Sequence, residues 1–265
     1  MSTTARQRYS VPALAKAIEI VDVIAQHSEG CRLTDIVNQL GLSKSTVSFI
    51  LSTLEENAYV RRLPDSRRYV IGLHLFEVGT KYLGQLQWRK EFIGVAQRLV
   101  DMWGETIQMA ILSGRDVLYI ARLEGHQPVR LVSHIGSRLP AHATALGKAM
   151  LAFLPSEDIY SLYRERGLEK LTDRTISSLP ELVADLEKVR QRGYAIDDQE
   201  TDAHLRCVAV PIARGGRAKA ACSISGLADR MTDERIQEML VALVEVSHTL
   251  SRSIYEAIPV GDFPG

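Results

Sequence analysis

Short hydroxyl side chains and one lysine gather at the start of the segment GLSKSTVSFILSTLEE, which spans residues 41–56. Hydroxyl and ammonium groups of this kind bond to the phosphates and base edges of DNA. The candidate contact residues on this segment are Ser43, Lys44, Ser45, Thr46, Ser48, Phe49 and Ser52. Because most of these side chains are short, another surface can approach closely, and we expect that surface to be a DNA duplex.

A second segment, LPAHATALGKA at residues 139–149, has a composition suited to binding a small anion. Its small residues let a ligand come near the backbone, and the first turn of a helix offers N–H groups that lack intrahelical acceptors. We expect a loop to open a helix near His142, where a small carboxylate would fit. The alternative is a helix start whose alanines serve close packing only.

Two helices joined by a short turn are predicted to position the first set of residues. The apolar residues Val47, Ile50, Leu51 and Leu54 recur at helical spacing. Ser43 is a suitable N-cap for that helix, and Thr34 is a suitable N-cap for a preceding helix that Gly41 ends. With a further helix over residues 12–28, this arrangement is typical of a helix-turn-helix, and Thr34 joins the candidate DNA contacts.

A basic hairpin is predicted directly after the second of these helices. YVRRLPDSRRYVIG, at residues 59–72, has two β-rich runs around the turn residues 64–66. Arg67 and Arg68 would contact the DNA backbone beside the helix. Three helices followed by such a hairpin form a winged helix-turn-helix. The alternative is an ordinary surface helix with solvated arginines, because helix-turn-helix geometry also occurs without DNA.

The remaining chain reads as a mixture of helices and strands. Residues 73–103 look helical with a short break. Strands are predicted at TIQMAILS, VLYIARL and VRLVS, and later at YAI, CVAVPI and AKAACSIS. Helices are predicted over SLPELVADLEKVRQRG and over MTDERIQEMLVALVEVSHTLSRSIYEAI, which Thr232 would cap. Because strands and helices do not alternate strictly, we expect an α+β domain that senses a small molecule.

Composition and charge limit the possible classes of protein. The chain has 265 residues, 46% hydrophobic and 24% charged residues and a formal net charge of zero, so a surface for nucleic acid must be local. No apolar run is long enough for a membrane span, and the first residues lack the apolar core of a signal peptide. The odd number of cysteines, three, argues against a disulfide framework, so we expect a cytoplasmic protein that does not bind membranes.

Three segments make the chain similar to a known family. They are LTDIVNQLGLSKSTV with the following LEENAYVRR and RYVIG, then GSRLPAHATALGKAMLAFLP, and finally RGYAIDDQE with LRCVAVPI and ACSISG. In this order they resemble the IclR family of bacterial transcriptional regulators over roughly residues 11–254. The resemblance implies a winged helix-turn-helix, a linker helix and a GAF-like effector-binding domain whose antiparallel sheet is flanked by helices.

The resemblance also implies an effector pocket with named residues. By position, the amides of Ala145 and Leu146 would take the carboxylate of the effector. Across the pocket would lie Asp197, Cys207, Ser223 and Ser225. Their chemistry agrees, because the two serines alternate on one strand and face the same side. In the plainer alternative, Cys207 is a core residue and Asp197 caps a turn.

Some residues depart from the family pattern. Phe49 stands where the family usually has an arginine, which removes a contact to phosphate or guanine. Phe49 would either touch a thymine methyl group or pack against the helix of residues 34–40. Ala58 replaces a common glycine after the recognition helix, and His204 stands where a glycine often lies.

An enzyme or a metal protein is the competing class. The chain has no nucleophile elbow, P-loop or dinucleotide-binding motif, so we expect neither catalytic residues nor a cofactor. Acidic residues cluster at 197–202, and His204 with Cys207 has a spacing that metal ligands use. A metal-binding or enzymatic small-molecule domain fused to a helix-turn-helix is therefore the alternative. A solvated loop with one buried cysteine explains the same residues without a metal.

We therefore expect a ligand-responsive transcriptional regulator, a repressor rather than an activator. Residues 1–72 would bind a double-stranded operator, 73–90 would form the linker helix, 91–256 would bind the effector, and 257–265 would be a tail. The effector would be a keto, hydroxy, sugar or aromatic acid. Because paired half-sites call for a two-fold protein, we expect a homodimer, which the resemblance extends to a dimer of dimers. Candidate dimer contacts are Leu73, Leu75, Phe76, Val78 and Leu83, and the alternative is that these residues pack within one chain.

Overall fold

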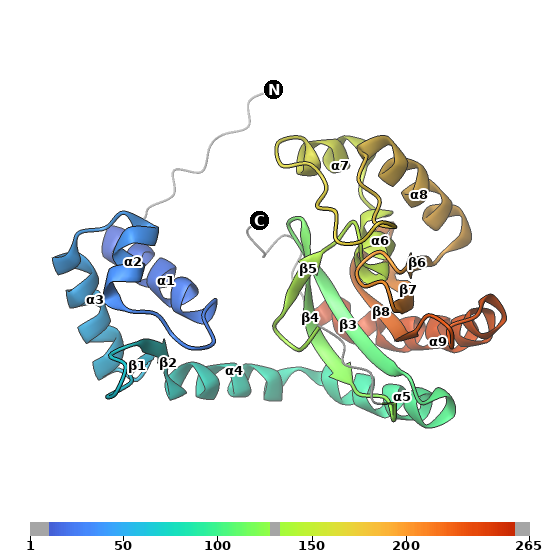
Figure 1. The fold of residues 1–265 in the computed structure, drawn as a ribbon. Helices are drawn as coiled ribbons and strands as arrows, with labels where there is room; N and C mark the ends of the chain where they lie inside the picture. Colours follow the sequence, from blue (N-terminus) through green and yellow to red (C-terminus); the bar gives the residue numbers. More distant parts are fainter. Residues whose placement is uncertain (1–10, 128–132, 258–265) are drawn as a thin grey trace. The chain divides into compact units, whose positions relative to one another are not determined.

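The fold consists of two compact units, which are described separately (Figure 1). The computed structural model describes residues 11–127 and 133–257. The first unit extends to Gln85 and the second begins at Leu86, so the division lies inside the linker segment expected over residues 73–90. Within the described ranges, no helix combines the length and the apolar character needed to cross a lipid bilayer.

The first unit is a helix-turn-helix followed by a two-stranded hairpin and one more helix, as predicted. Its elements are α1 (Pro12–Ala25), α2 (Leu33–Leu40), α3 (Lys44–Glu56), β1 (Val60–Arg62), β2 (Tyr69–Ile71) and α4 (Leu73–Gln85). Ile20 and Ile24 from α1, Ile36 from α2, and Val47 and Leu51 from α3 pack together in its core. The strands β1 and β2 are antiparallel and form the wing.

Two helix ends in this unit differ from the prediction. The first helix ends at Ala25 and not at residue 28. The N-cap of α2 is Arg32 and not Thr34, since the backbone N–H of Arg32 donates to the carboxylate of Asp35 at 2.9 Å. An acidic residue at the third helical position satisfies the cap in this way, which leaves the Thr34 hydroxyl exposed in the first turn.

Ala58 has the left-handed backbone conformation that favours glycine, with φ of +57°. A Cβ atom in this conformation is strained, so we expect Ala58→Gly to raise the free energy of unfolding of this unit by about 0.5–1 kcal/mol. Gly41→Ala is the matched control. The φ of Gly41 is +64° and an added Cβ would meet open space, so this variant introduces the same backbone strain without a clash and should lower the free energy of unfolding. Chemical denaturation of the full-length protein measures both changes, and an Ala58→Gly variant less stable than the parent would refute this reasoning.

The second unit is built on a six-stranded antiparallel sheet with the strand order β5-β4-β3-β8-β7-β6. The strands are β3 (Thr106–Ser113), β4 (Asp116–Leu123), β5 (Arg138–Pro140), β6 (Ala195–Asp198), β7 (Leu205–Arg214) and β8 (Arg217–Leu227). The helices are α5 (Gln87–Trp103), α6 (Ala145–Leu151), α7 (Ser156–Tyr163), α8 (Leu179–Arg192) and α9 (Asp233–Ala257). Figure 1 shows α5 and α9 on one face of the sheet and α6 on the other, with α7 and α8 outside α6.

Most predicted elements of this unit are present, and three predictions need comment. The helix expected near His142 begins at Ala145, because Thr144 is its N-cap and accepts a bond from the N–H of Gly147 at 3.0 Å. Residues 138–140, which were read as part of a loop, form the short edge strand β5. The predicted strand VRLVS lies outside the described residues except for Ser133.

Candidate functional site

One face of α3 carries four exposed side chains that were predicted to contact DNA. Ser45, Ser48, Phe49 and Ser52 are spaced i, i+3, i+4 and i+7 and are all exposed. The opposite face holds Val47 and Leu51, which are fully buried. The hydroxyl-bearing face of α3 therefore points to solvent. A recognition helix needs such an exposed face to contact DNA.

The hydroxyls at the start of α3 form a connected set. Ser43 is the N-cap, and its Oγ accepts from the backbone N–H of Thr46 at 3.2 Å. The same oxygen lies 3.0 Å from the Oγ of Ser45 and 2.8 Å from the Oγ1 of Thr46. Ser43 thus holds the first turn together, while Lys44 is exposed beside it.

The two arginines predicted to contact DNA from the wing have different environments. Arg67 is exposed and has a φ of +53° where the chain turns back into β2. Arg68 is half-buried, and its guanidinium donates to the backbone oxygen of Gly30 at 2.7 Å. Arg68 therefore connects the wing to the turn after α1. Of the two arginines, Arg67 is the one whose side chain faces solvent.

Phe49 does not pack against α2, which was one of its two expected roles. Its side chain is 76% exposed, the highest fraction among the large apolar side chains of α3. Its backbone oxygen accepts from the hydroxyl of Thr53, as is common within helices, and involves no neighbouring element. Most of the phenyl ring is therefore left uncovered by the described part of this unit.

A cavity of about 200 Å³ lies between α6 and the sheet of the second unit. All six residues predicted to bind the effector line it, namely Ala145, Leu146, Asp197, Cys207, Ser223 and Ser225. The other lining residues were not among the six predicted to bind the effector: Gln108, Tyr119, Ser133, Leu139, Thr144, Leu171, Thr201, Asp202 and Leu205. Residues from all six strands, from α6 and from four connecting segments thus meet at one cavity.

Strand register brings the polar residues of the sheet together. Asp197 pairs with Cys207, and Cys207 pairs with Ser225, so the three form one row across β6, β7 and β8. In the next row Ser223 pairs with Gln108 of β3. Because side chains alternate between the faces of a sheet, residues in these rows point to the α6 side, where the cavity lies.

Most of the hydroxyl and amide groups of the cavity bond to one another. The Gln108 side chain donates to the Oγ of Ser133 at 2.6 Å and accepts from the Oγ of Ser225 at 3.2 Å. The Oγ of Ser223 differs, since it is buried and has no hydrogen-bond partner among the described residues. A buried hydroxyl without a partner is costly, so Ser223 is suited to bond a ligand in the cavity.

Asp197 both lines the cavity and holds the loop that follows β6. Its Oδ1 accepts from the N–H of Glu200 at 2.7 Å and from the N–H of Thr201 at 3.3 Å, and its Oδ2 accepts from the Thr201 hydroxyl. These contacts agree with the plainer expectation that Asp197 caps a turn. Burial raises the pKa of this carboxyl, which the bonds from Thr201 and Glu200 oppose.

Cys207 is a polarisable part of the cavity wall with a protonated thiol. Burial raises its pKa well above the ordinary range, and the carboxylate of Asp197 acts in the same direction. Since the thiolate is the nucleophilic form of cysteine, Cys207 is poorly suited to covalent chemistry. The Ser225 hydroxyl, which lies beside Cys207 in the strand row, lowers the pKa and so acts in the opposite direction.

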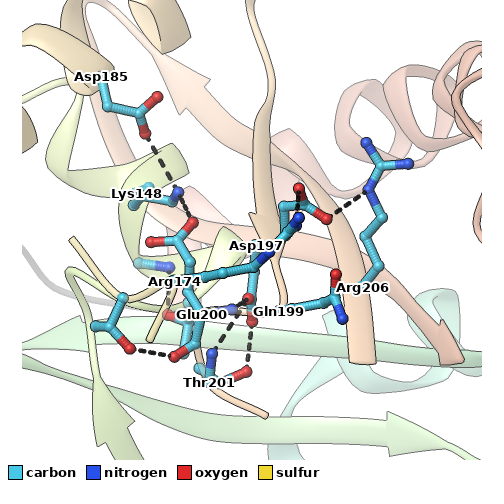
Figure 2. A network of polar contacts seen from close by, with 12 residues as sticks. Lys148, Arg174, Asp185, Asp197, Gln199, Glu200, Thr201 and Arg206 are labelled. Atoms are coloured by element: carbon cyan, nitrogen blue, oxygen red, sulfur yellow. Dashed lines mark hydrogen bonds and ion pairs between the residues drawn. The ribbon is translucent and has the colours of Figure 1, made fainter. Parts of the chain in front are cut away.

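A buried lysine with two carboxylates lies directly behind the cavity. The Nζ of Lys148 contacts the Oε1 of Glu200 and lies 3.2 Å from the Oδ2 of Asp185, as Figure 2 shows. The side chains of Lys148 and Glu200 are 2% and 7% exposed. Burial raises the pKa of Glu200 to about 7, although the ammonium group of Lys148 opposes the shift. The sequence signals for this cluster were a lysine within an alanine-rich helix start and Glu200 within the acidic residues at 197–202, and nothing in the sequence linked the two.

The ion pair joins two walls of the cavity. Lys148 belongs to α6, one turn after Ala145 and Leu146, and Glu200 precedes Thr201 in the loop that Asp197 holds (Figure 2). The backbone oxygen of Glu200 also accepts from the hydroxyl of Thr175 at 2.6 Å. These contacts fix the loop relative to the first turn of α6.

The first turn of α6 supplies backbone donors to the cavity. Ala145 and Leu146 occupy its first two positions, where helical geometry provides no acceptor for the N–H groups. Gly147 must be glycine, because an added Cβ would lie 2.1 Å from the backbone oxygen of Ala141. The preceding turn thus folds tightly over the helix start, whose first two residues line the cavity.

The described part of the chain contains no group of three or more His, Cys, Asp or Glu side chains that could hold a metal ion. Cys207 points to the cavity described above, while His204 lies on the exposed turn before β7.

Comparison with known families matches both units. The model for the bacterial transcriptional regulator IclR C-terminal domain matches residues 80–252, and the model for the IclR helix-turn-helix domain matches residues 13–64. The two matches together extend over most of the chain.

Individual relatives are similar over nearly the whole length. The HTH-type transcriptional regulator XynR of Escherichia coli is 33% identical over 245 residues, which cover 92% of this chain and 97% of the relative. The acetate operon repressor of Salmonella typhimurium is 32% identical over 249 residues, with coverage of 93% and 91%. The crystal structure of the Thermotoga maritima IclR has a TM-score of 0.69 at 33% identity and covers 92% of this chain and 98% of its own.

Proposed function

The chain belongs to the IclR family of bacterial transcriptional regulators, and from this premise we propose that a small organic acid in the cavity of the second unit controls binding of the first unit to an operator. One observation supports the proposal most strongly: all six residues expected to bind the effector line the same cavity. The exposed hydroxyl face of α3 and the exposed Arg67 of the wing support its DNA-binding half. The protein would act where the bacterial chromosome lies, in the cytoplasm.

The composition of the cavity favours an acid that also carries polar oxygen atoms. Among its described lining residues none is lysine or arginine, so the carboxylate would be held by the amides of Ala145 and Leu146. The hydroxyl of Ser223 would supply another bond. Asp202 and Asp197 favour a ligand with hydroxyl donors, as in a hydroxy or sugar acid. The carbonyl oxygen of a keto acid would instead accept a bond from Ser223, and keto and aromatic acids remain within the proposed class.

We propose that the protein represses transcription and that it works as a homodimer, which can pair into a dimer of dimers. The relative from Salmonella typhimurium is named as a repressor. On α4, the side chains of Leu73, Phe76 and Val78 are 67%, 69% and 47% exposed, whereas Leu75 and Leu83 are partly buried. The three exposed residues are suited to contact a second copy of the chain.

Regulation would come from a difference in effector affinity between two placements of the units. An effector that prefers one placement would change the spacing of the paired α3 helices, which must match half-sites about 34 Å apart. Such coupling is typically about 1–3 kcal/mol, and it cannot exceed the difference in affinity between the two states. The proposal assigns no catalytic reaction to the cavity.

A thermal-shift screen of small carboxylates tests the effector half. At 100 times its dissociation constant, a true effector stabilises the fold by roughly 2.7 kcal/mol, which raises the melting temperature by several degrees. A panel of keto, hydroxy, sugar and aromatic acids in which none shifts the melting temperature would contradict the proposed class of ligand.

Replacing Lys44 or Arg67 by alanine tests the DNA-binding half. Each change removes a phosphate contact, so we expect weaker binding to all duplexes and a salt dependence of log K reduced in slope by about 1 for each contact. Fluorescence anisotropy with a labelled duplex between about 50 and 200 mM salt measures both quantities.

Two further variants make this test specific. Arg166→Ala removes the same charge from an exposed position in the other unit, and it should leave affinity and slope unchanged. Arg68→Ala should lower stability as well as affinity, because it releases the bond to Gly30. If Lys44→Ala and Arg166→Ala changed affinity and salt dependence equally, the proposal that the start of α3 contacts DNA would be wrong.

A further inference from the structure

The outward face of α3 has an unusual combination of chemical groups for a surface that reads DNA. The four residues of this stripe are three serines and Phe49, at spacing i, i+3, i+4 and i+7. Ser45 is already bonded to Ser43, and Ser52 donates to the carboxylate of Glu56 at 3.3 Å. The stripe itself contains no arginine, lysine, asparagine or glutamine.

This composition limits what the stripe can recognise. Guanine is usually read by a bidentate arginine or lysine, and adenine by a bidentate asparagine or glutamine. A serine hydroxyl makes single bonds and accepts several base edges, so the three serines discriminate weakly. The phenyl ring of Phe49 is the large apolar group of the stripe, and the matching apolar group in the major groove is the C5-methyl of thymine.

The surroundings of Phe49 leave the ring available for such a contact. It is 76% exposed, and it is flanked on its own face by the small side chains of Ser45, Ser48 and Ser52. Short neighbours allow a base edge to reach the ring. Burying an apolar surface that the free protein leaves in water is favourable, so the ring gains free energy only when a partner covers it.

We propose that Phe49 is a specificity-determining residue that contacts a thymine methyl group in each half-site of the operator. The inference rests on the proposed DNA-binding function and adds to it the base pair that α3 reads. It predicts an operator with an A·T pair at the position facing Phe49. The protein would distinguish this base pair from others through the methyl group of the thymine and not through hydrogen bonds.

Exchange of thymine for uracil tests the inference, since it removes only the methyl group. The full-length protein is first used to select duplexes from a library with a random core. Each thymine of the selected duplex is then replaced by uracil in both half-sites. From the transfer free energy of one buried methyl group, we expect about fourfold weaker binding per half-site, or roughly 15-fold for the pair, at one symmetric position.

Variants of Phe49 assign the effect to this side chain. Phe49→Ala should bind the thymine and uracil duplexes equally, at about the affinity of the parent protein for uracil. Phe49→Leu, which keeps an apolar side chain, should still prefer thymine. Because the Phe49 side chain is 76% exposed, we expect neither variant to lose stability, and circular dichroism checks this directly.

The outcomes separate this inference from the proposed function. If the protein selects a sequence but no uracil exchange weakens binding, or if Phe49→Ala keeps the preference for thymine, the role given to Phe49 is wrong and the DNA-binding function stands. If the protein selects no sequence, the proposed function fails together with the inference.

Discussion

Replacing Lys148 by methionine is expected to lower the free energy of unfolding of the second unit by about 3–5 kcal/mol. The ammonium group is 2% exposed and contacts carboxylates of Glu200 and Asp185. Methionine fills similar space but leaves these carboxylates without their cation. Breaking a buried ion pair from one side is far more destabilising than removing both partners, because an uncompensated charge remains buried.

Two comparisons isolate this effect in chemical denaturation. The double variant Lys148→Met with Glu200→Gln should recover much of the loss, because it no longer buries the charge of Glu200. Lys170→Met removes a lysine from an exposed pair with Asp173, in which the side chains are 55% and 102% exposed, so it should change stability by less than about 1 kcal/mol. A Lys148→Met variant as stable as Lys170→Met would show that the buried cluster does not hold the fold.

Replacing Ser223 by alanine is expected to weaken effector binding by about 10- to 100-fold while leaving the unliganded protein as stable as before, or more stable. The buried Oγ of Ser223 has no partner among the described residues, so its removal breaks no bond within the fold. The Ser223 hydroxyl would contribute to binding only when it forms a hydrogen bond with an oxygen atom of the ligand. Isothermal titration with an acid identified by the thermal-shift screen measures the affinity.

Ser225→Ala is the matched control on the same strand. The Oγ of Ser225 donates to the Gln108 side chain at 3.2 Å, so its loss should lower stability by about 1 kcal/mol. Ser225→Ala should therefore lower stability, whereas Ser223→Ala should lower only the affinity for the ligand. A Ser223→Ala variant that is destabilised and binds the acid normally would show that the ligand does not bind beside Ser223.

The helix-turn-helix could be predicted from sequence because its signals are local. The spacing of Val47, Leu51 and their neighbours, the cap at Ser43 and the break at Gly41 act within a few residues of one another. The errors were local as well. Thr34 was taken as an N-cap because the competing bond between Asp35 and the backbone of Arg32 depends on which residue begins the helix.

The cavity could be predicted only in part, and the resemblance to a family supplied most of it. Alternation along β8 placed Ser223 and Ser225 on one face, but their nearness to Asp197 depends on the strand order, which is not a local property. The cluster around Lys148 was missed for the same reason. Its partners Asp185 and Glu200 come from α8 and from the loop after β6, and no local pattern links them.

The affinity of the full-length protein for a selected duplex, measured with and without a saturating acid from the thermal-shift screen, tests the central claim most directly. We predict tight binding to a two-fold symmetric sequence and a change in dissociation constant of about 5- to 150-fold when the acid is present. Ser223→Ala should shift this response to higher acid concentrations. Equal affinity for the selected duplex and for random DNA, or a selected duplex whose binding no stabilising acid alters, would contradict the account.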